Sequence, residues 1–208
     1  CTASTDDVTI DADEDPTVSA AGSDQTVCPT TATLAGNTAT TGTGAWTTVS
    51  GSGSASTASS ATSGVTGLTQ GGSTVLRWTI SNGVCTSSSD DVTIASDETS
   101  VAGSITPVTS AICYNTNTTL TLSGNTGTIQ WTQSASAGGP FSAILGETAS
   151  TYTTPNLTSN MYYKAQVTNG VCVTAVTANP PARVLPKADF SAGAINTTGE
   201  TVGYGGDP

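Results

Sequence analysis

Apolar residues along this chain alternate with polar residues in short runs. In the clearest run, STVLRWTIS at 73–81, Leu76, Trp78 and Ile80 share one face while Arg77 points to the other. Alternation with a period of two indicates half-buried strands, and no stretch shows the periodicity of a helix. Comparable runs are TATLAG at 31–36, DVTI at 91–94 and TLTLSG at 119–124. The pattern therefore predicts an all-β protein whose strands recur about every ten residues, as in a β-sandwich.

The strands belong to a tandem repeat. CTASTDDVTI at 1–10 returns as CTSSSDDVTI at 85–94, with eight of ten positions identical, and SNGVC at 81–85 returns as TNGVC at 168–172. A fixed period of this kind is the signature of a repeat architecture. The first ten residues are then the last strand of a repeat, and we expect them to be ordered only where neighbouring strands are supplied.

The repeat divides the chain into four parts. They are a truncated upstream repeat with an acidic linker (1–15), two complete repeats (16–98 and 99–186), and the beginning of a following repeat (187–208). A unit of this size can bury one small core.

Tryptophans mark the core of each repeat. Cys28 and Cys113 are each followed 18 positions later by a tryptophan, Trp46 and Trp131. Both fall on the third expected strand, where an immunoglobulin-like sandwich places its core tryptophan. The alternation puts Trp78 on the core face as well. The matched spacing favours core packing over a role as an exposed platform for sugars.

A hairpin precedes the last strand of each repeat. Asn82-Gly83 is a strong hairpin signal and predicts a type I′ turn, with positive φ at both residues. The second repeat carries the same Asn-Gly pair at 169–170.

The five cysteines predict one disulfide per repeat. The repeat pairs Cys28 with Cys85 and Cys113 with Cys172, while Cys1 aligns with Cys85 and is unpaired because its repeat is truncated. Each bridge would tie the end of a first strand to the start of a last strand. Paired cysteines at a repeating spacing indicate an oxidising, extracellular location.

One position breaks this cysteine pattern. Gly203 stands where the first cysteine of the following repeat is expected, and the sequence gives no reason for the change.

Composition excludes several classes of function. Charged residues make up 9% of the chain, Lys and Arg number four, and the net charge is -11. There is no basic footprint for nucleic acid, no basic amphipathic helix and no apolar run long enough to enter a membrane. No histidine is present, so the usual base and the commonest metal ligand are missing. We therefore expect no enzymatic activity.

Acidic residues cluster at the junctions between successive repeats. Carboxylate oxygens are the ligands that Ca²⁺ prefers, so these clusters could hold calcium and stiffen the array. The alternative, which we favour, is that the acids keep exposed linkers soluble and that no cofactor binds. The calcium candidates are Asp11, Asp13, Glu14, Asp15, Asp97 and Glu98.

The second repeat carries a longer pattern, W-x-x-S, then TYTTPNLTS, then YYKAQVTNGVC, over residues 131–172. This pattern resembles the immunoglobulin-like and PKD-like tandem repeats of large Bacteroidetes cell-surface proteins. They include gliding-motility adhesins exported by type IX secretion. The resemblance implies beads on a string in a secreted surface filament used for attachment or gliding.

Two functions remain open. The first is a structural and adhesive segment of an extracellular stalk, whose partners are the neighbouring repeats of the same long chain. The alternative is a carbohydrate-binding module that displays a site for surface polysaccharide, with Tyr152 and Tyr162 as the candidate exposed aromatics.

Overall fold

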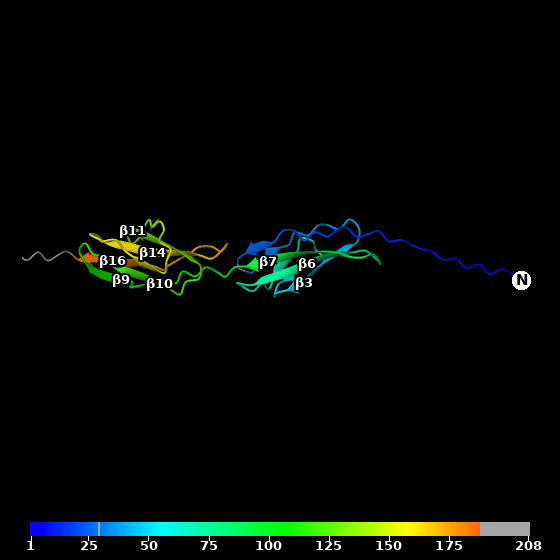
Figure 1. Ribbon diagram of the computed structural model, residues 1–208, viewed down its shortest axis with the longest axis horizontal. Coiled ribbons are helices and arrows are strands. Elements are labelled where there is room, and N and C mark those ends of the chain that lie inside the picture. Colours follow the sequence, from blue (N-terminus) through cyan, green and yellow to red (C-terminus); the bar gives the residue numbers. More distant parts are fainter. Residues whose placement is uncertain (29, 188–208) are drawn as a thin grey trace, which may run out of the picture.

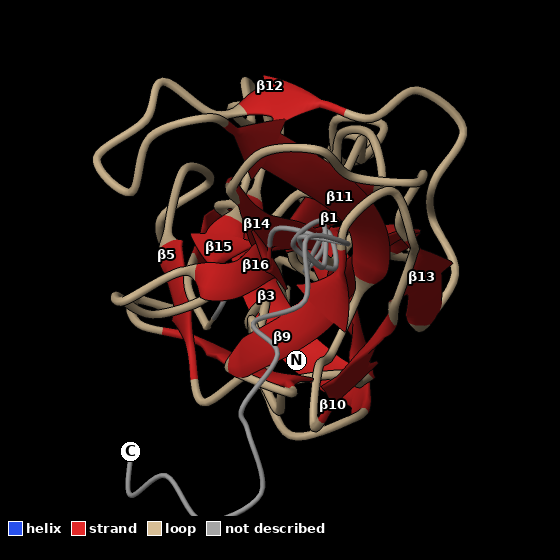
Figure 2. Cartoon of the chain, turned by 90° about the vertical axis from the view of Figure 1, so that its left-hand side faces the viewer, coloured by secondary structure: helices blue, strands red, loops and turns tan. Residues whose placement is uncertain are grey.

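The computed structural model describes residues 1–28 and 30–187, and in this part of the chain every regular element is a β-strand. The strands form two β-sandwiches that follow one another along the long axis of the molecule (Figure 1). Seen along that axis, the described chain contains strands and loops alone (Figure 2). Each sandwich encloses its own hydrophobic core. The all-β architecture expected from the alternation is confirmed.

The first sandwich packs a four-stranded sheet of order β1-β7-β6-β3 against a three-stranded sheet of order β2-β5-β4. Its strands are β1 (Gln25–Val27), β2 (Ala32–Thr33), β3 (Thr43–Ser50), β4 (Ser54–Ala55), β5 (Gly64–Thr66), β6 (Ser73–Ser81) and β7 (Ser88–Ser96).

The second sandwich packs a larger sheet of order β12-β11-β14-β16-β9, with β15 paired to β14, against a three-stranded sheet of order β13-β10-β8. Its strands are β8 (Ser104–Thr106), β9 (Thr109–Cys113), β10 (Thr119–Ser123), β11 (Thr128–Ser134), β12 (Ser142–Ala143), β13 (Thr151–Thr153), β14 (Met161–Thr168), β15 (Ala175–Val176) and β16 (Ala182–Lys187). Of the expected following repeat (187–208), Lys187 is the last residue of β16, and the remainder, including Gly203, lies outside the described residues.

Strand β6 shows how the alternation builds a core. Leu76, Trp78 and Ile80 are buried, while Arg77 on the opposite face pairs with Asp91 at 2.7 Å. The Arg77 guanidinium lowers the pKa of the Asp91 carboxyl below its ordinary value through a hydrogen bond. Since both side chains are well exposed, solvent screens this pair and it contributes little to stability.

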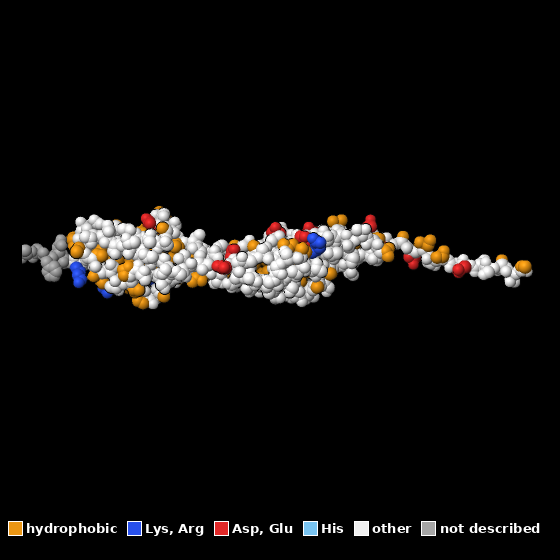
Figure 3. Space-filling view, turned by 60° about the horizontal axis from the view of Figure 1, so that its bottom comes forward, with side chains coloured by type: hydrophobic (Ala, Val, Ile, Leu, Met, Phe, Trp, Pro, Cys, Tyr) orange, Lys and Arg blue, Asp and Glu red, His pale blue; other side chains and the backbone are white. Residues whose placement is uncertain are grey.

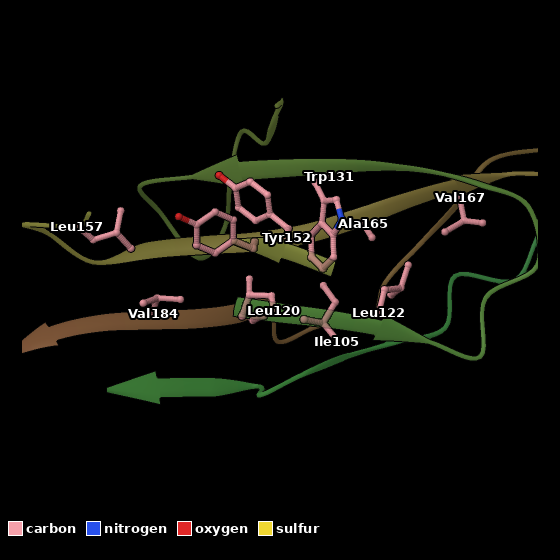
Figure 4. Packing of buried hydrophobic residues seen from close by; sticks show 11 residues of the cluster. Ile105, Leu120, Leu122, Trp131, Tyr152, Leu157, Ala165, Val167 and Val184 are labelled. Carbon is pink, nitrogen blue, oxygen red and sulfur yellow. The ribbon is translucent and has the colours of Figure 1, made fainter. Parts of the chain in front are cut away.

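The tryptophans lie in the two cores. Trp46 on β3 packs against Trp78 with ring centroids 5.0 Å apart, and Trp131 on β11 packs against Tyr152 at 5.7 Å. The indole of Trp131 also donates a hydrogen bond of 2.8 Å to a backbone carbonyl oxygen, that of Ala149. Its ring faces the opposite sheet (Figure 4). These rings fill the sandwiches and offer no surface to a ligand.

The expectation that Tyr152 is exposed is wrong. Tyr152 is 5% exposed, because β13 turns its side chain inward between Trp131 and Tyr163. Strand β13 alternates like β6, with Thr151 and Thr153 outside and the tyrosine inside.

Replacing Tyr163 by phenylalanine should stabilise the second sandwich by about 1 kcal/mol, because a buried hydroxyl without a partner carries an uncompensated desolvation cost. The Tyr163 hydroxyl is buried and makes no hydrogen bond to the described residues. Burial also raises the pKa of this phenol well above its ordinary value. Thermal unfolding of Tyr163→Phe measures the effect, with Tyr152→Phe as the control. A lower melting temperature for Tyr163→Phe would contradict the expectation.

The first residues of the chain extend away from the first sandwich (Figure 1) and contain no strand through residue 24. Val8 and Ile10 are 83% and 86% exposed, whereas their repeat equivalents in β7, Val92 and Ile94, are 1% and 0% exposed. The same sequence is thus a core strand in one setting and an unpaired segment in the other.

Candidate interdomain junction

The direction of the first strand fixes where one pair of cysteines lies. Strand β1 runs parallel to β7, with Val27 opposite Ser96, so both strands end at the downstream end of the first sandwich. Strand β9 runs parallel to β16 in the same way, with Cys113 opposite Lys187. Cys28 and Cys113, which we call the strand cysteines, therefore lie at the downstream ends of their sandwiches.

The other pair of cysteines lies at the upstream ends. The hairpin between β6 and β7 sits where the chain enters the first sandwich, because the Asn82 side chain donates to the carbonyl oxygen of Glu14 at 2.8 Å. In the second sandwich, Asn169 donates to the carbonyl oxygen of Glu98 at 2.9 Å. Cys85 and Cys172 follow these two asparagines, and we call them the hairpin cysteines.

A disulfide joins the two sandwiches. Cys28, the strand cysteine of the first, is bonded to Cys172, the hairpin cysteine of the second, with 5.2 Å between the Cα atoms and a sequence separation of 144. Cys1, Cys85 and Cys113 are free.

The expected pairing within each repeat, Cys28 with Cys85 and Cys113 with Cys172, is therefore wrong. In a pair of parallel strands, the end of one and the start of the other lie at opposite ends of the sheet. Strand β7 has nine residues, so about 30 Å of extended chain separates its start near Cys85 from its end near Cys28. A disulfide requires Cα atoms within about 7 Å.

The acidic linker between the sandwiches is held from both sides. The Asp97 amide donates to the carbonyl oxygen of Val27 in the first sandwich at 3.0 Å. The Asp97 carboxylate accepts the amide of Val171 in the second sandwich at 2.9 Å. Gly170 brings the hairpin backbone against this carboxylate, because a Cβ at that position would overlap it. One aspartate therefore connects the end of β1 in one unit with the hairpin of the next.

The hairpin turn differs from the expected type I′. Gly83 has φ of +52°, but Asn82 is not in the left-handed region, and Asn115 alone among the described non-glycine residues has positive φ. The turn closes with the Cys85 amide on the carbonyl oxygen of Asn82 at 3.1 Å, so Gly83 and Val84 are its central residues. The asparagine side chain is thereby left to reach the linker.

Replacing Asp97 by alanine should loosen this junction and make the Cys28–Cys172 bond easier to reduce. A hydrogen bond to a charged acceptor is worth about 1.5–3 kcal/mol, and its loss frees the hairpin from the linker. The measurement is the rate of reduction by dithiothreitol, which we expect to rise several-fold.

Asp13→Ala is the matched control, since Asp13 makes the equivalent bond at the upstream end, away from the disulfide. Equal reduction rates in Asp97→Ala and the unmodified chain would show that the carboxylate does not hold the junction.

The carboxylates that are candidates for calcium binding do not form a common site. Asp13 and Asp97 each accept a hairpin amide, and among residues 1–28 and 30–187 no three or more Asp, Glu, Cys or His side chains come together as a metal site. Acidic groups are visible around the junction and along the N-terminal segment (Figure 3). The interpretation that we favour, in which these acids keep the linkers soluble and hold no cofactor, stays a prediction.

The outer face of the second sandwich carries two partly exposed aromatic side chains, Tyr162 and Phe141. The Arg183 guanidinium lies over the Tyr162 ring at 5.9 Å, and the Lys164 ammonium lies over the Phe141 ring at 5.1 Å. Strands β14 and β16 place Tyr162 directly opposite Arg183. We call these four residues the outer patch.

Comparison with solved structures places the fold. A structure of three immunoglobulin domains of titin (I67–I69) has a TM-score of 0.50 at 12% identity, and the match covers 83% of this chain. A marsupial T cell receptor has a TM-score of 0.51 at 10% identity, and the match covers 86% of this chain and 74% of the receptor chain. The fold is immunoglobulin-like. This chain spans 65% of the titin structure's length, and at such identities the likeness concerns the fold alone.

A sequence comparison matches only the part of the chain that forms the second sandwich. A family model described as a domain of unknown function (DUF8696) matches residues 101–184, which lie within the second sandwich. No curated protein matches the chain. Among the described residues, no helix has the length and apolar character that crossing a bilayer requires.

Proposed function

We propose that this chain is a structural and adhesive segment of a long extracellular repeat protein, in which immunoglobulin-like units form a stiff surface stalk or filament. The Cys28–Cys172 bond carries this proposal. Neither cysteine belongs to the hydrophobic core cluster of its sandwich. The effect of the bond is to hold one sandwich against the next, which is the requirement of a rod.

The remaining junction contacts support the same function. The linker from Asp97 to Ser100 is short, and its polar groups bond to both sandwiches, so little freedom remains for bending. A structural disulfide fits an extracellular location. A protein of the Bacteroidetes gliding-motility adhesin type would use such a filament for attachment or gliding, with neighbouring repeats as its partners.

Small-angle scattering of the oxidised chain tests this proposal. We expect a single elongated particle with a fixed maximum dimension. Cys28→Ser should broaden the distribution of distances between the sandwiches, because the peptide linker alone then joins them. A distribution that is equally broad for the oxidised chain and for Cys28→Ser would contradict a rigid rod.

The outer patch supports a second candidate, a carbohydrate-binding module. The Tyr162 and Phe141 rings are partly exposed and aromatic rings can stack on sugars, while Lys164 and Arg183 attract negative charge in an otherwise acidic chain. The polysaccharide that fits this surface is anionic, with uronic acid or sulfate groups. A glycan array tests it: Tyr162→Ala and Arg183→Ala should lose binding, and Arg77→Ala on the first sandwich should not. A chain that binds no glycan leaves the purely structural function.

We expect chelation to leave stability unchanged, because the junction aspartates are already engaged by backbone amides. The measurement is the melting temperature with added calcium and with EDTA. A rise of several degrees with calcium would instead show a bound ion, since a ligand that binds the folded state stabilises it.

A further inference from the structure

We propose that Cys85 and Cys113 are halves of further junctions of the kind formed by Cys28 and Cys172. Cys85 would bond to the strand cysteine of a preceding repeat unit, and Cys113 to the hairpin cysteine of a following unit. Every unit would then be joined to each neighbour by a peptide linker and by a disulfide. This inference rests on the proposed structural function and extends it from one junction to the array.

The upstream hairpin repeats the contacts of the bonded hairpin. The Val84 amide donates to the Asp13 carboxylate at 3.0 Å, as Val171 does to Asp97 at 2.9 Å. In each hairpin the glycine before the valine lies directly against that carboxylate. The asparagine before that glycine donates its side-chain amide to the carbonyl oxygen of the linker glutamate, at 2.8 Å upstream and 2.9 Å in the junction.

The two hairpin sulfurs also occupy comparable places on their linkers. The Cys85 sulfur lies 3.5 Å from the carbonyl oxygen of Asp13. The Cys172 sulfur lies 4.0 Å from the carbonyl oxygen of Asp97 and 3.2 Å from that of Glu98. Cys85 is therefore held where its bonded equivalent is held.

Cys85 and Cys113 cannot form a disulfide with each other within one chain. Cys85 lies at the upstream end of the first sandwich, and Cys113 ends β9 at the downstream end of the second. Two sandwiches in line separate them (Figure 1). Each faces the direction in which an adjoining unit would lie, and one cysteine of each kind is what a head-to-tail array requires.

The chemistry is an oxidation. Two thiols lose two protons and two electrons as the sulfur–sulfur bond forms, and a disulfide oxidant accepts them and becomes two thiols. Burial raises the pKa of the Cys85 thiol, and the negative charges of Asp15 and Asp13 raise it further. A protonated thiol reacts slowly with oxidants in solution.

A duplicated chain tests the upstream half. Residues 1–98 are followed directly by residues 15–208, so that Asp97 and Glu98 of the first copy take the place of Asp13 and Glu14. Thr86→Ser in the second copy gives its hairpin peptide a distinct mass. The chain is oxidised with glutathione disulfide and alkylated, and its disulfides are mapped with a protease other than trypsin, because Lys and Arg number only four.

We expect Cys85 of the second copy to be bonded, and to become free when Cys28→Ser is introduced in the first copy. Cys28→Ser in the second copy should free Cys172 and leave that Cys85 bonded. An alkylated Cys85 in the second copy, or one bonded to Cys28 of its own copy, overturns the proposal.

A second duplication tests the downstream half without relying on the first. Residues 1–186 are followed by residues 97–208, which keeps Asp97 in the new linker. Cys113 of the first copy should bond to Cys172 of the second copy, and a free Cys113 overturns this half. In either chain the Cys28–Cys172 bond and the scattering profile report separately on the rod, so the two proposals can fail independently.

Discussion

Replacing Cys28 by serine should lengthen the fully stretched chain by about 500 Å. When the chain is pulled from its two ends, the Cys28–Cys172 bond carries the force past the residues between them, and these cannot extend. The sequence separation of 144 residues, at about 3.6 Å each, gives the added length once the bond is gone. Single-molecule force spectroscopy measures it as the contour length after the last unfolding event.

The same measurement separates the two possible pairings. If Cys28 were bonded to Cys85, 57 residues apart, Cys28→Ser would release only about 200 Å. Cys113→Ser is the matched control. It should leave the contour length unchanged, because Cys113 is free, whereas pairing within the second repeat would make it release about 200 Å as well.

Replacing Trp131 by alanine should cost the second sandwich about 3–5 kcal/mol, because it removes a large side chain from a close-packed core. Trp131 is 0% exposed, packs on Tyr152 and donates a hydrogen bond across the sandwich. That cost is a large part of the stability of a small domain. Calorimetry should therefore show one of the two unfolding transitions shifted strongly downward.

Two variants control for this result. Trp46→Ala should lower the transition of the first sandwich instead, since Trp46 occupies the equivalent place there. Leu145→Ala removes apolar surface from a side chain that is 91% exposed and should shift neither transition. A single transition that moves equally in both tryptophan variants would show that the sandwiches unfold as one unit.

The sequence was sufficient to predict the fold, because the alternation of apolar and polar residues within a β-strand shows which of its faces is buried. Leu76, Trp78 and Ile80 alternate with exposed residues whatever their strand pairs with, so alternation alone predicts the core face. Tyr152 was misassigned because β13 has only three residues, and a strand of that length shows no alternation that can be recognised.

The junction was not predictable in the same way, because it depends on strand direction. The sequence predicts that Cys28 lies at the end of the first strand or in the turn after it, and that Cys85 lies near the start of the last strand. Whether those points are near or far depends on whether β1 and β7 are parallel, and alternation is the same in both cases. The signal that could have helped is the match of Asp13 and Glu14 to Asp97 and Glu98, each pair preceding a unit with the same hairpin.

The Cys28–Cys172 bond also changes the effect of proteolytic cleavage. Proteases attack exposed loops first, and Leu145 lies in such a loop, which matters for the extracellular location that we propose. A single cleavage there leaves the two fragments covalently connected, because that loop lies between the bonded cysteines. The damaged unit can lose its fold while the two ends of the chain stay attached to each other. For the surface stalk that we propose, continuity after damage matters as much as stiffness before it.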